Sequence, residues 1–295
     1  MKWDWWAPLK MFAELTKLKL AGAATLSTAT GAMLFLHRFR WSVAAASIGV
    51  FLLALGSCAL NQIQDRGYDA RMNRTCRRPV AGGRMSCVAA GWISALLMAS
   101  GFVLLWKLHG SGPALLGSVA VLLYNGFYTY LKRVWAFAAV PGAVVGAIPP
   151  LIGWTAAGGR FADPQILVVA FFFFIWQAPH FWMLLFLYGK EYEEAGLPAL
   201  TRIFSFKQFS RITFFWILIT AASGLLFPFY GVVSSLWVCF ALLICSIALI
   251  VMTTPLLRRN HSLHSLRRAF HSINIYALLV MLLLIAAALG MNHSI

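Results

Sequence analysis

The stretch from Trp41 to Pro79, WSVAAASIGVFLLALGSCALNQIQDRGYDARMNRTCRRP, decides the fold of this protein. Its first half, residues 41–60, is mostly apolar, and a run of about 20 such residues is long enough to cross a lipid bilayer as an α-helix. The second half gathers amide, carboxylate and guanidinium groups in a chain that is otherwise 61% hydrophobic and only 11% charged. The stretch therefore predicts a membrane helix that ends in a polar site at the membrane surface.

Apolar runs of this kind recur along all 295 residues. The alternation of polar and apolar residues typical of a membrane β-barrel is absent from the sequence. We therefore predict a single all-α, polytopic membrane domain over residues 1–295. The first run ends without a small-residue cleavage site and the second follows at once, so we expect a retained helix and not a signal peptide. The predicted transmembrane helices, nine in number, are 18–36, 41–60, 87–106, 113–130, 137–157, 164–187, 211–229, 233–252 and 273–291.

The fifth of these runs contains three prolines, Pro141, Pro149 and Pro150. Proline lacks the amide hydrogen that continues a helix and clashes with the preceding turn. We therefore expect this helix to be kinked or broken. Neighbouring helices or a cavity must then satisfy the backbone groups that the break frees.

The distribution of basic residues predicts which loops lie on the cytoplasmic side of the membrane. With nine helices, 20 of the 24 lysines and arginines fall in the N-terminal segment or in the loops after the second, fourth, sixth and eighth helices. Basic loops stay in the cytoplasm, so we expect the N-terminus inside and the C-terminus outside. This distribution accounts for the net charge of +16, and we expect no nucleic-acid partner.

The acidic residues are rarer and more concentrated. The chain has eight carboxylates, and five of them fall in two clusters at the predicted cytoplasmic ends of helices. In the first cluster Asn61, Asp65 and Asp69 are spaced by four residues, which places all three on one face of a helix. Two aspartates so placed repel each other unless a cation lies between them. Hard oxygen ligands favour Mg²⁺, and the arginines that follow favour phosphate, so we predict a site for a magnesium-bound diphosphate.

The second cluster lies in the stretch WQAPHFWMLLFLYGKEYEEAGLP, from Trp176 to Pro198. Glu191, Glu193 and Glu194 follow the sixth predicted helix. Inside that helix, Gln177 and His180 lie three residues apart and so share one face. An ionisable residue within a membrane helix is a candidate for function, although a histidine there can also serve only in packing.

At these residues the sequence resembles the UbiA superfamily of intramembrane prenyltransferases, and more narrowly its heme-farnesylating branch. The segments WQ-PHF and PP-IGW distinguish this branch from the quinone prenyltransferases. The resemblance covers most of the chain, and the stretches that carry it are TKLKLAGAATLSTATG (16–31), NQIQDRGYDARMNRTCRRP (61–79), YTYLKR and GAVVGAIPPLIGW (128–154), and WQAPHFWMLL and EYEEAGLPAL (176–200).

The resemblance implies a nine-helix bundle around a central cavity, in the cytoplasmic (inner) membrane of a bacterium, with its active site on the cytoplasmic side. It implies Mg²⁺-bound farnesyl diphosphate as donor, heme B as acceptor, and heme O with diphosphate as products. A heme A synthase or a terminal oxidase would then be a partner that takes the product. The sequence leaves open whether one or two Mg²⁺ ions bind. Glu191 stands where the family usually has aspartate.

The resemblance also implies a role for each candidate residue. The expected metal ligands and catalytic residues are Asn61, Asp65, Asp69 and Glu191. The expected diphosphate ligands are Arg74, Arg78, Lys132 and Arg133. The expected residues for the heme acceptor are His180, Gln177 and Arg77, with His180 binding the iron or orienting a water molecule.

Two other functions fit parts of the sequence. A UbiA-type prenyltransferase acting on an aromatic quinone precursor would share the first acidic cluster. A heme-binding or transport protein without chemistry would instead place its charges at mid-bilayer, in broken helices. The clustering of the acids near one membrane face argues against this second alternative.

Overall fold

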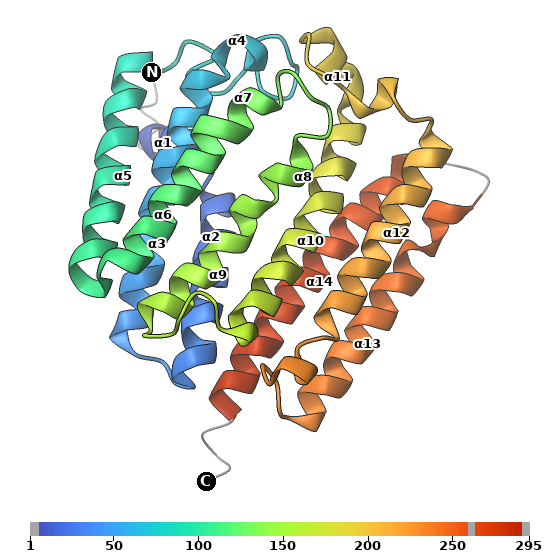
Figure 1. The fold of residues 1–295 in the computed structure, drawn as a ribbon. Coiled ribbons are helices and arrows are strands. Elements are labelled where there is room, and N and C mark those ends of the chain that lie inside the picture. The colour runs from blue at the N-terminus through green and yellow to red at the C-terminus, as the bar shows by residue number, and fades with distance from the viewer. Residues whose placement is uncertain (1–5, 259–262, 291–295) are drawn as a thin grey trace.

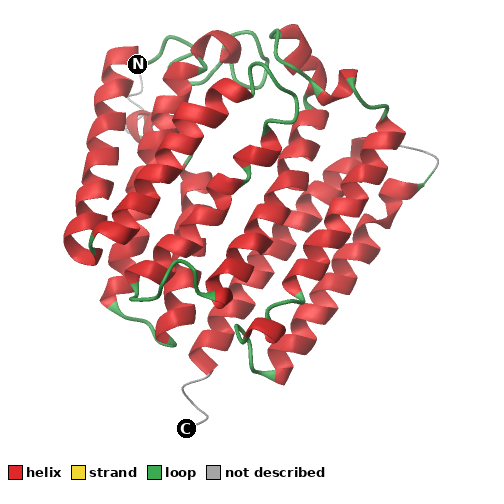
Figure 2. Ribbon diagram, viewed as in Figure 1, coloured by secondary structure: helices red, strands yellow, loops and turns green. Residues whose placement is uncertain are grey.

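The computed structural model describes residues 6–258 and 263–290, and every regular element within them is a helix (Figure 2). The long helices lie side by side in one bundle and alternate in direction (Figure 1). They are α2 (Leu18–Leu36), α3 (Trp41–Gln64), α5 (Cys87–His109), α6 (Ser111–Val121), α9 (Val144–Ala156), α10 (Pro164–Leu187), α12 (Phe206–Gly224), α13 (Leu236–Thr253) and α14 (Leu263–Gly290).

Shorter helices complete the bundle, mostly at its ends. The segments η1 (Leu122–Tyr128) and α7 (Thr129–Leu131) extend α6, and α8 (Ala139–Gly142) precedes α9. One end of the bundle gathers α4 (Arg66–Asp69), α7 and α11 (Gly189–Glu194), at the top of Figure 1. The remaining short helices are α1 (Ala7–Thr16), η2 (Leu200–Arg202), η3 (Pro228–Tyr230) and η4 (Thr254–Leu257).

Seven helical segments of the described chain are long and apolar enough to cross a membrane, which confirms an all-α integral membrane protein. They are Trp41–Gln64, Cys87–His109, Ser111–Leu131, Ala139–Ala156, Pro164–Leu187, Leu236–Leu257 and Leu263–Gly290. The other two predicted spans correspond to α2 and α12, which belong to the same bundle but carry more hydroxyl or charged residues. The total of nine spans therefore stays a prediction.

Helix limits agree closely at some spans and differ at others. α2 and α10 have the predicted limits, whereas the seventh span was predicted at 211–229 and the helix runs from Phe206 to Gly224. Its start is fixed by a capping box, in which the Ser205 side chain accepts from the Gln208 amide and the Gln208 side chain accepts from the Ser205 amide. The ninth span was predicted from 273, whereas the structure describes α14 from Leu263, and the first turns of this helix carry polar and basic side chains.

The predicted break in the fifth span is confirmed. α8 ends at Gly142, directly after Pro141, and α9 begins at Val144. Pro149 and Pro150 both lie inside α9. The interruption is the single residue Ala143, so α8 and α9 together still form one membrane-length segment, Ala139–Ala156.

Helices α2 and α9 approach each other through glycines. A Cβ atom on Gly153 would lie 1.9 Å from the carbonyl oxygen of Thr28, and one on Gly31 would lie 2.1 Å from that of Pro150. Only a residue without a side chain fits at such distances. Small residues at helix contacts are typical of membrane proteins, where association depends on close packing.

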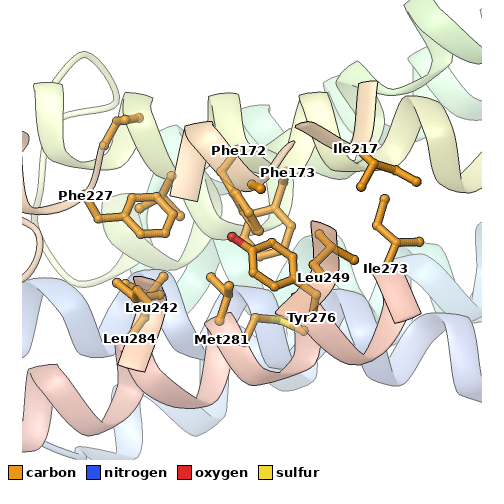
Figure 3. Close-up of a cluster of buried hydrophobic side chains, with 14 of the residues drawn as sticks. Phe172, Phe173, Ile217, Phe227, Leu242, Leu249, Ile273, Tyr276, Met281 and Leu284 are labelled. Carbon is orange, nitrogen blue, oxygen red and sulfur yellow. The ribbon is translucent and has the colours of Figure 1, made fainter. Parts of the chain in front are cut away.

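A second packing centre joins α10, α12, α13 and α14 (Figure 3). Phe172 of α10 packs edge-on against Phe227, with ring centroids 5.4 Å apart, and also contacts Tyr276 of α14. The Tyr276 hydroxyl, the oxygen visible at the centre of Figure 3, lies 3.0 Å from the hydroxyl of Ser246. This core fixes α10, which carries His180, against α14.

Candidate active site

The first acidic cluster lies at the junction of α3 and α4. Asp65 follows the last residue of α3, and the backbone hydrogen bonds Asp65 N to Asn61 O (2.9 Å) and Asp69 N to Asp65 O (2.8 Å) keep the helical spacing. Asn61, Asp65 and Asp69 are 2%, 4% and 2% exposed. The structure therefore brings the three predicted ligands together on one buried face.

Asp65 is surrounded by basic groups from a distant part of the chain. Its Oδ2 accepts a hydrogen bond from Asn61 Nδ2 at 2.8 Å and forms an ion pair with Lys132. Its Oδ1 lies 3.5 Å from Nη2 of Arg133. Lys132 and Arg133 follow α7 directly. The end of the continuous segment formed by α6, η1 and α7 therefore supplies the basic partners of Asp65.

Asp69 has its own cationic partner. Nη1 of Arg78 lies 2.8 Å from one carboxylate oxygen and 2.7 Å from the other. A buried carboxylate is stable only when it is paired in this way. Four of the predicted ligands for metal and diphosphate thus form two adjacent acid–base pairs, Asp65 with Lys132 and Asp69 with Arg78.

The second acidic cluster lies at the same end of the bundle and contacts the basic segment that follows the first cluster. Glu191 of α11 accepts a hydrogen bond from the backbone amide of Arg74, with 2.9 Å between Oε2 and N. The Arg74 guanidinium lies over the ring of Tyr188, 4.7 Å from its centroid. Glu193, by contrast, accepts a hydrogen bond from Thr201 and lies 3.6 Å from Arg202.

A basic cavity opens beside these contacts. It has a volume of about 770 Å³. Arg74, Arg77, Arg78 and Arg84 line it, together with Glu14 of α1. Arg78 therefore lines this cavity and also pairs with Asp69.

Lys17 is a site residue that the sequence did not single out. It occupies the turn between α1 and α2 with a left-handed backbone (φ 50°), and its Nζ donates to Asn61 Oδ1 at 2.9 Å. The pKa of Lys17 is lowered to about 8, mainly by burial. The nearby Cys58 and Asp69 oppose this shift, and the positive charges of Arg78 and Lys132 contribute to it. The ammonium group therefore occupies one side of the predicted metal ligand Asn61.

The unusual helix η1 positions a second residue that the sequence missed. The seven residues of η1 form a π-helix, a wider turn that is often found at functional sites. Thr129, which follows it, donates to the Tyr124 carbonyl at 2.8 Å and accepts from Asn61 Nδ2 at 3.2 Å. A π-helix cannot be recognised from apolar spacing, so only the structure shows this contact.

The oxygen ligands of this site fit a metal that is shared with its substrate. Within residues 6–258 and 263–290, no three His, Cys, Asp or Glu side chains lie close enough to hold a metal alone. Asn61, Asp65 and Asp69 supply a carboxamide and two carboxylates, all hard ligands. Mg²⁺ is commonly bound through one or two carboxylates plus substrate phosphates, so this sparse set fits it.

The three residues predicted for the heme acceptor lie in different surroundings. Arg77 is exposed at the basic cavity. Gln177 packs against α9, where a Cβ on Gly146 would come within 1.4 Å of its side-chain oxygen. His180 faces α14, with its Nδ1 2.7 Å from Asn274 Oδ1. The shared helical face of Gln177 and His180 thus contacts two different neighbours.

Aromatic rings connect the acidic cluster to His180. The Lys132 ammonium lies over the ring of Tyr128, 5.8 Å from its centroid. Tyr128 stacks on Phe181 at 6.1 Å, and Phe181 meets His180 edge-on at 5.5 Å. The two predicted parts of the site, one acidic and one containing histidine, are therefore neighbours separated by apolar rings.

Known proteins show the family to which this chain belongs. Residues 21–274 match the model of the UbiA prenyltransferase family. The chain belongs to the UbiA prenyltransferase family. This UbiA-family chain is 33% identical over 277 residues to the protoheme IX farnesyltransferase of Oleidesulfovibrio alaskensis, covering 94% of this chain and 96% of that protein. It is 36% identical over 244 residues to the enzyme of the same name from Geobacter sulfurreducens, covering 83% and 88%.

Solved structures share the fold of this chain. The structure of a digeranylgeranylglyceryl phosphate synthase aligns with a TM-score of 0.74 at 18% identity, covering 96% of this chain and 99% of that one. A UbiA homologue from Archaeoglobus fulgidus, solved with GPP and Mg²⁺, aligns with a TM-score of 0.66 at 12% identity, covering 95% and 99%.

Proposed function

We propose that this prenyltransferase moves a farnesyl group from farnesyl diphosphate to a vinyl group of heme B, forming heme O and diphosphate. The observation that carries the proposal is the buried pair of Asp65 and Asp69, ringed by basic side chains and joined by aromatic rings to His180. The names of the relatives, protoheme IX farnesyltransferases, support heme as the acceptor.

Asn61, Asp65, Asp69 and Glu191 are the residues that would hold Mg²⁺, as one ion or two. The metal, when bound, neutralises charge on the leaving diphosphate. The A. fulgidus homologue solved with GPP and Mg²⁺ supports this assignment. Lys132 and Arg78 each end in a flexible side chain, so they can exchange a carboxylate partner for a diphosphate oxygen when substrate enters.

The chain's own residues then address the main obstacle, which is the separation of an allylic cation from a highly charged diphosphate. Arg74, Arg78, Lys132 and Arg133 bind the diphosphate oxygens and stabilise the charge that builds up on them. Tyr128 and Phe181 line the space between the diphosphate and His180 and keep bulk water away from the cation. The vinyl carbon attacks the farnesyl C1, the C1–oxygen bond breaks, and one water adds its hydroxyl to the porphyrin side and releases a proton.

The heme acceptor would lie on the His180 side of these rings. His180 would bind the iron or orient the water, Gln177 would contact the macrocycle, and Arg77 at the basic cavity would pair with a propionate. Arg77 is exposed and lies apart from the other two, so its role requires the propionates to reach the membrane surface.

The location of the site follows from the same features. The acidic cluster and the basic cavity lie at the end of the bundle where the basic loops gather, which is cytoplasmic by the positive-inside rule. We therefore place the enzyme in the bacterial inner membrane with its N-terminus inside. Heme O leaves for a heme A synthase or a terminal oxidase.

The direct test is to produce the protein in bacteria that lack heme O and to identify the extracted hemes by mass. We expect a heme heavier than heme B by one farnesyl group and one hydroxyl group. Membranes supplied with radioactive farnesyl diphosphate should label heme and not quinone precursors. Label in a quinone precursor would instead establish the alternative acceptor.

Lys17 gives this site a characteristic pH dependence. With a pKa of about 8, the free enzyme loses the Lys17 charge as pH rises through that value. Because the protonated form attracts diphosphate, the affinity for prenyl diphosphate should fall between about pH 7 and 9. Lys17→Arg keeps its charge throughout, so its affinity should be flat over this range. Calorimetry with a non-hydrolysable prenyl diphosphate analogue measures the affinity of the wild type and of Lys17→Arg at each pH. An equal loss of affinity in the two proteins would show that Lys17 is not the group that titrates.

A further inference from the structure

His180 is held by an asparagine that the sequence did not single out. Its Nδ1 lies 2.7 Å from Oδ1 of Asn274, on α14. Asn274 in turn donates from Nδ2 to the carbonyl oxygen of Phe270, also at 2.7 Å. Among the described residues, the bond to Asn274 is the one hydrogen bond that the imidazole makes.

The carbonyl oxygen of Phe270 determines the direction of both hydrogen bonds made by the Asn274 side chain. A backbone carbonyl oxygen only accepts, so the nitrogen of the Asn274 amide must face Phe270. The amide oxygen then faces His180 and can only accept, so Nδ1 must carry a proton. In the neutral ring, the lone pair available to a ligand is therefore on Nε2.

The plane of the ring is fixed as well. Trp176 lies with its centroid 4.9 Å from that of His180 and tilted by 36°, and Phe270 lies at 5.0 Å with a tilt of 33°. Phe181 closes a third side at 5.5 Å. These apolar neighbours favour a neutral imidazole, since a charge is costly within a membrane helix.

We propose that Asn274 is a positioning residue that holds His180 as the Nδ1–H tautomer and so presents Nε2 to the iron of a metalloporphyrin acceptor. This inference rests on the proposed function, because it takes heme as the acceptor. A metal-binding histidine usually donates its other ring N–H to an oxygen, which fixes the tautomer and raises the basicity of the ligand. The Asn274 oxygen occupies that place.

The tautomer can be measured without any heme. In protein labelled with ¹⁵N-histidine and reconstituted in lipid, the His180 resonances, identified by their loss in His180→Ala, should show a protonated Nδ1 and an unprotonated Nε2. In Asn274→Leu, which has a similar size but no acceptor, this preference should be lost. A protonated Nε2 in the wild-type protein would overturn the proposal.

Ligation is read from the spectrum and potential of ferric heme titrated into purified protein. His180→Ala should lose the absorption bands of imidazole-ligated heme. Asn274→Leu should bind heme about 10- to 100-fold more weakly. Asn274→Asp keeps an acceptor, so it should retain the affinity and shift the heme midpoint potential to a lower value. Ser272→Ala on the same helix, which removes only a hydroxyl bonded to the Arg268 carbonyl, is the matched control and should match wild type.

The outcomes separate this inference from the proposed function. Transfer of farnesyl to heme with unchanged spectra in His180→Ala would overturn the ligation and leave the proposed function standing. Heme ligation through His180 with label found only in a quinone precursor would overturn the proposed function and leave the inference standing. Unchanged affinity and potential in both Asn274 variants would overturn the positioning role.

Discussion

Asp65→Asn is expected to lower the rate of prenyl transfer by about 100- to 1000-fold or more, the cost of losing one preorganised electrostatic contact in an active site. The substitution removes one negative charge from a group that is 4% exposed and paired with Lys132 and Arg133. A carboxamide binds Mg²⁺ less well and leaves two basic side chains without their acid. Release of radioactive diphosphate in membranes, at saturating farnesyl diphosphate and heme, measures the effect.

The matched control is Asp163→Asn. Asp163 precedes the first residue of α10, at the end of that helix away from α11 and the acidic clusters. It accepts hydrogen bonds from Trp154 Nε1 and from the Arg160 amide, each at 2.8 Å. The same chemical change there should leave the rate close to wild type. An Asp65→Asn enzyme that makes heme O at the wild-type rate would exclude Asp65 from the metal site.

Gly153→Ala is expected to have the largest effect on folding. Its methyl group would lie 1.9 Å from the Thr28 carbonyl oxygen and 2.9 Å from the Ala32 nitrogen, both backbone atoms of α2. Neither can rotate away, so α2 and α9 must separate. Overpacking of this kind usually costs about 1–3 kcal/mol, and occasionally more. Thermal unfolding of the purified protein in detergent should show a melting temperature, the midpoint of unfolding, markedly lower than that of the wild type.

Gly22→Ala provides the comparison within α2. An added Cβ at Gly22 meets nothing within 4 Å, and alanine favours a helix, so the midpoint should stay the same or rise slightly. Equal midpoints for Gly153→Ala and Gly22→Ala would mean that the close approach of α2 and α9 does not limit stability.

Much of the fold could be predicted because the membrane imposes length and polarity on each helix. The limits of α2 and α10 and the break after Pro141 follow from apolar length and from proline chemistry. Helix ends with polar first turns could not be located in this way. The start of α12 depends on the capping box at Ser205, and α14 extends beyond its apolar part to Leu263.

The candidate active site, too, could be predicted only in part from the sequence. The four-residue spacing of Asn61, Asp65 and Asp69 is a local property of one helix, so the sequence alone determined that they share a face. Lys17, Thr129 and Asn274 reach Asn61 and His180 from distant parts of the chain, and only the tertiary structure decided those contacts. The physical reason is range: helical periodicity places residues three or four positions apart, whereas packing between helices brings together side chains separated by dozens of residues.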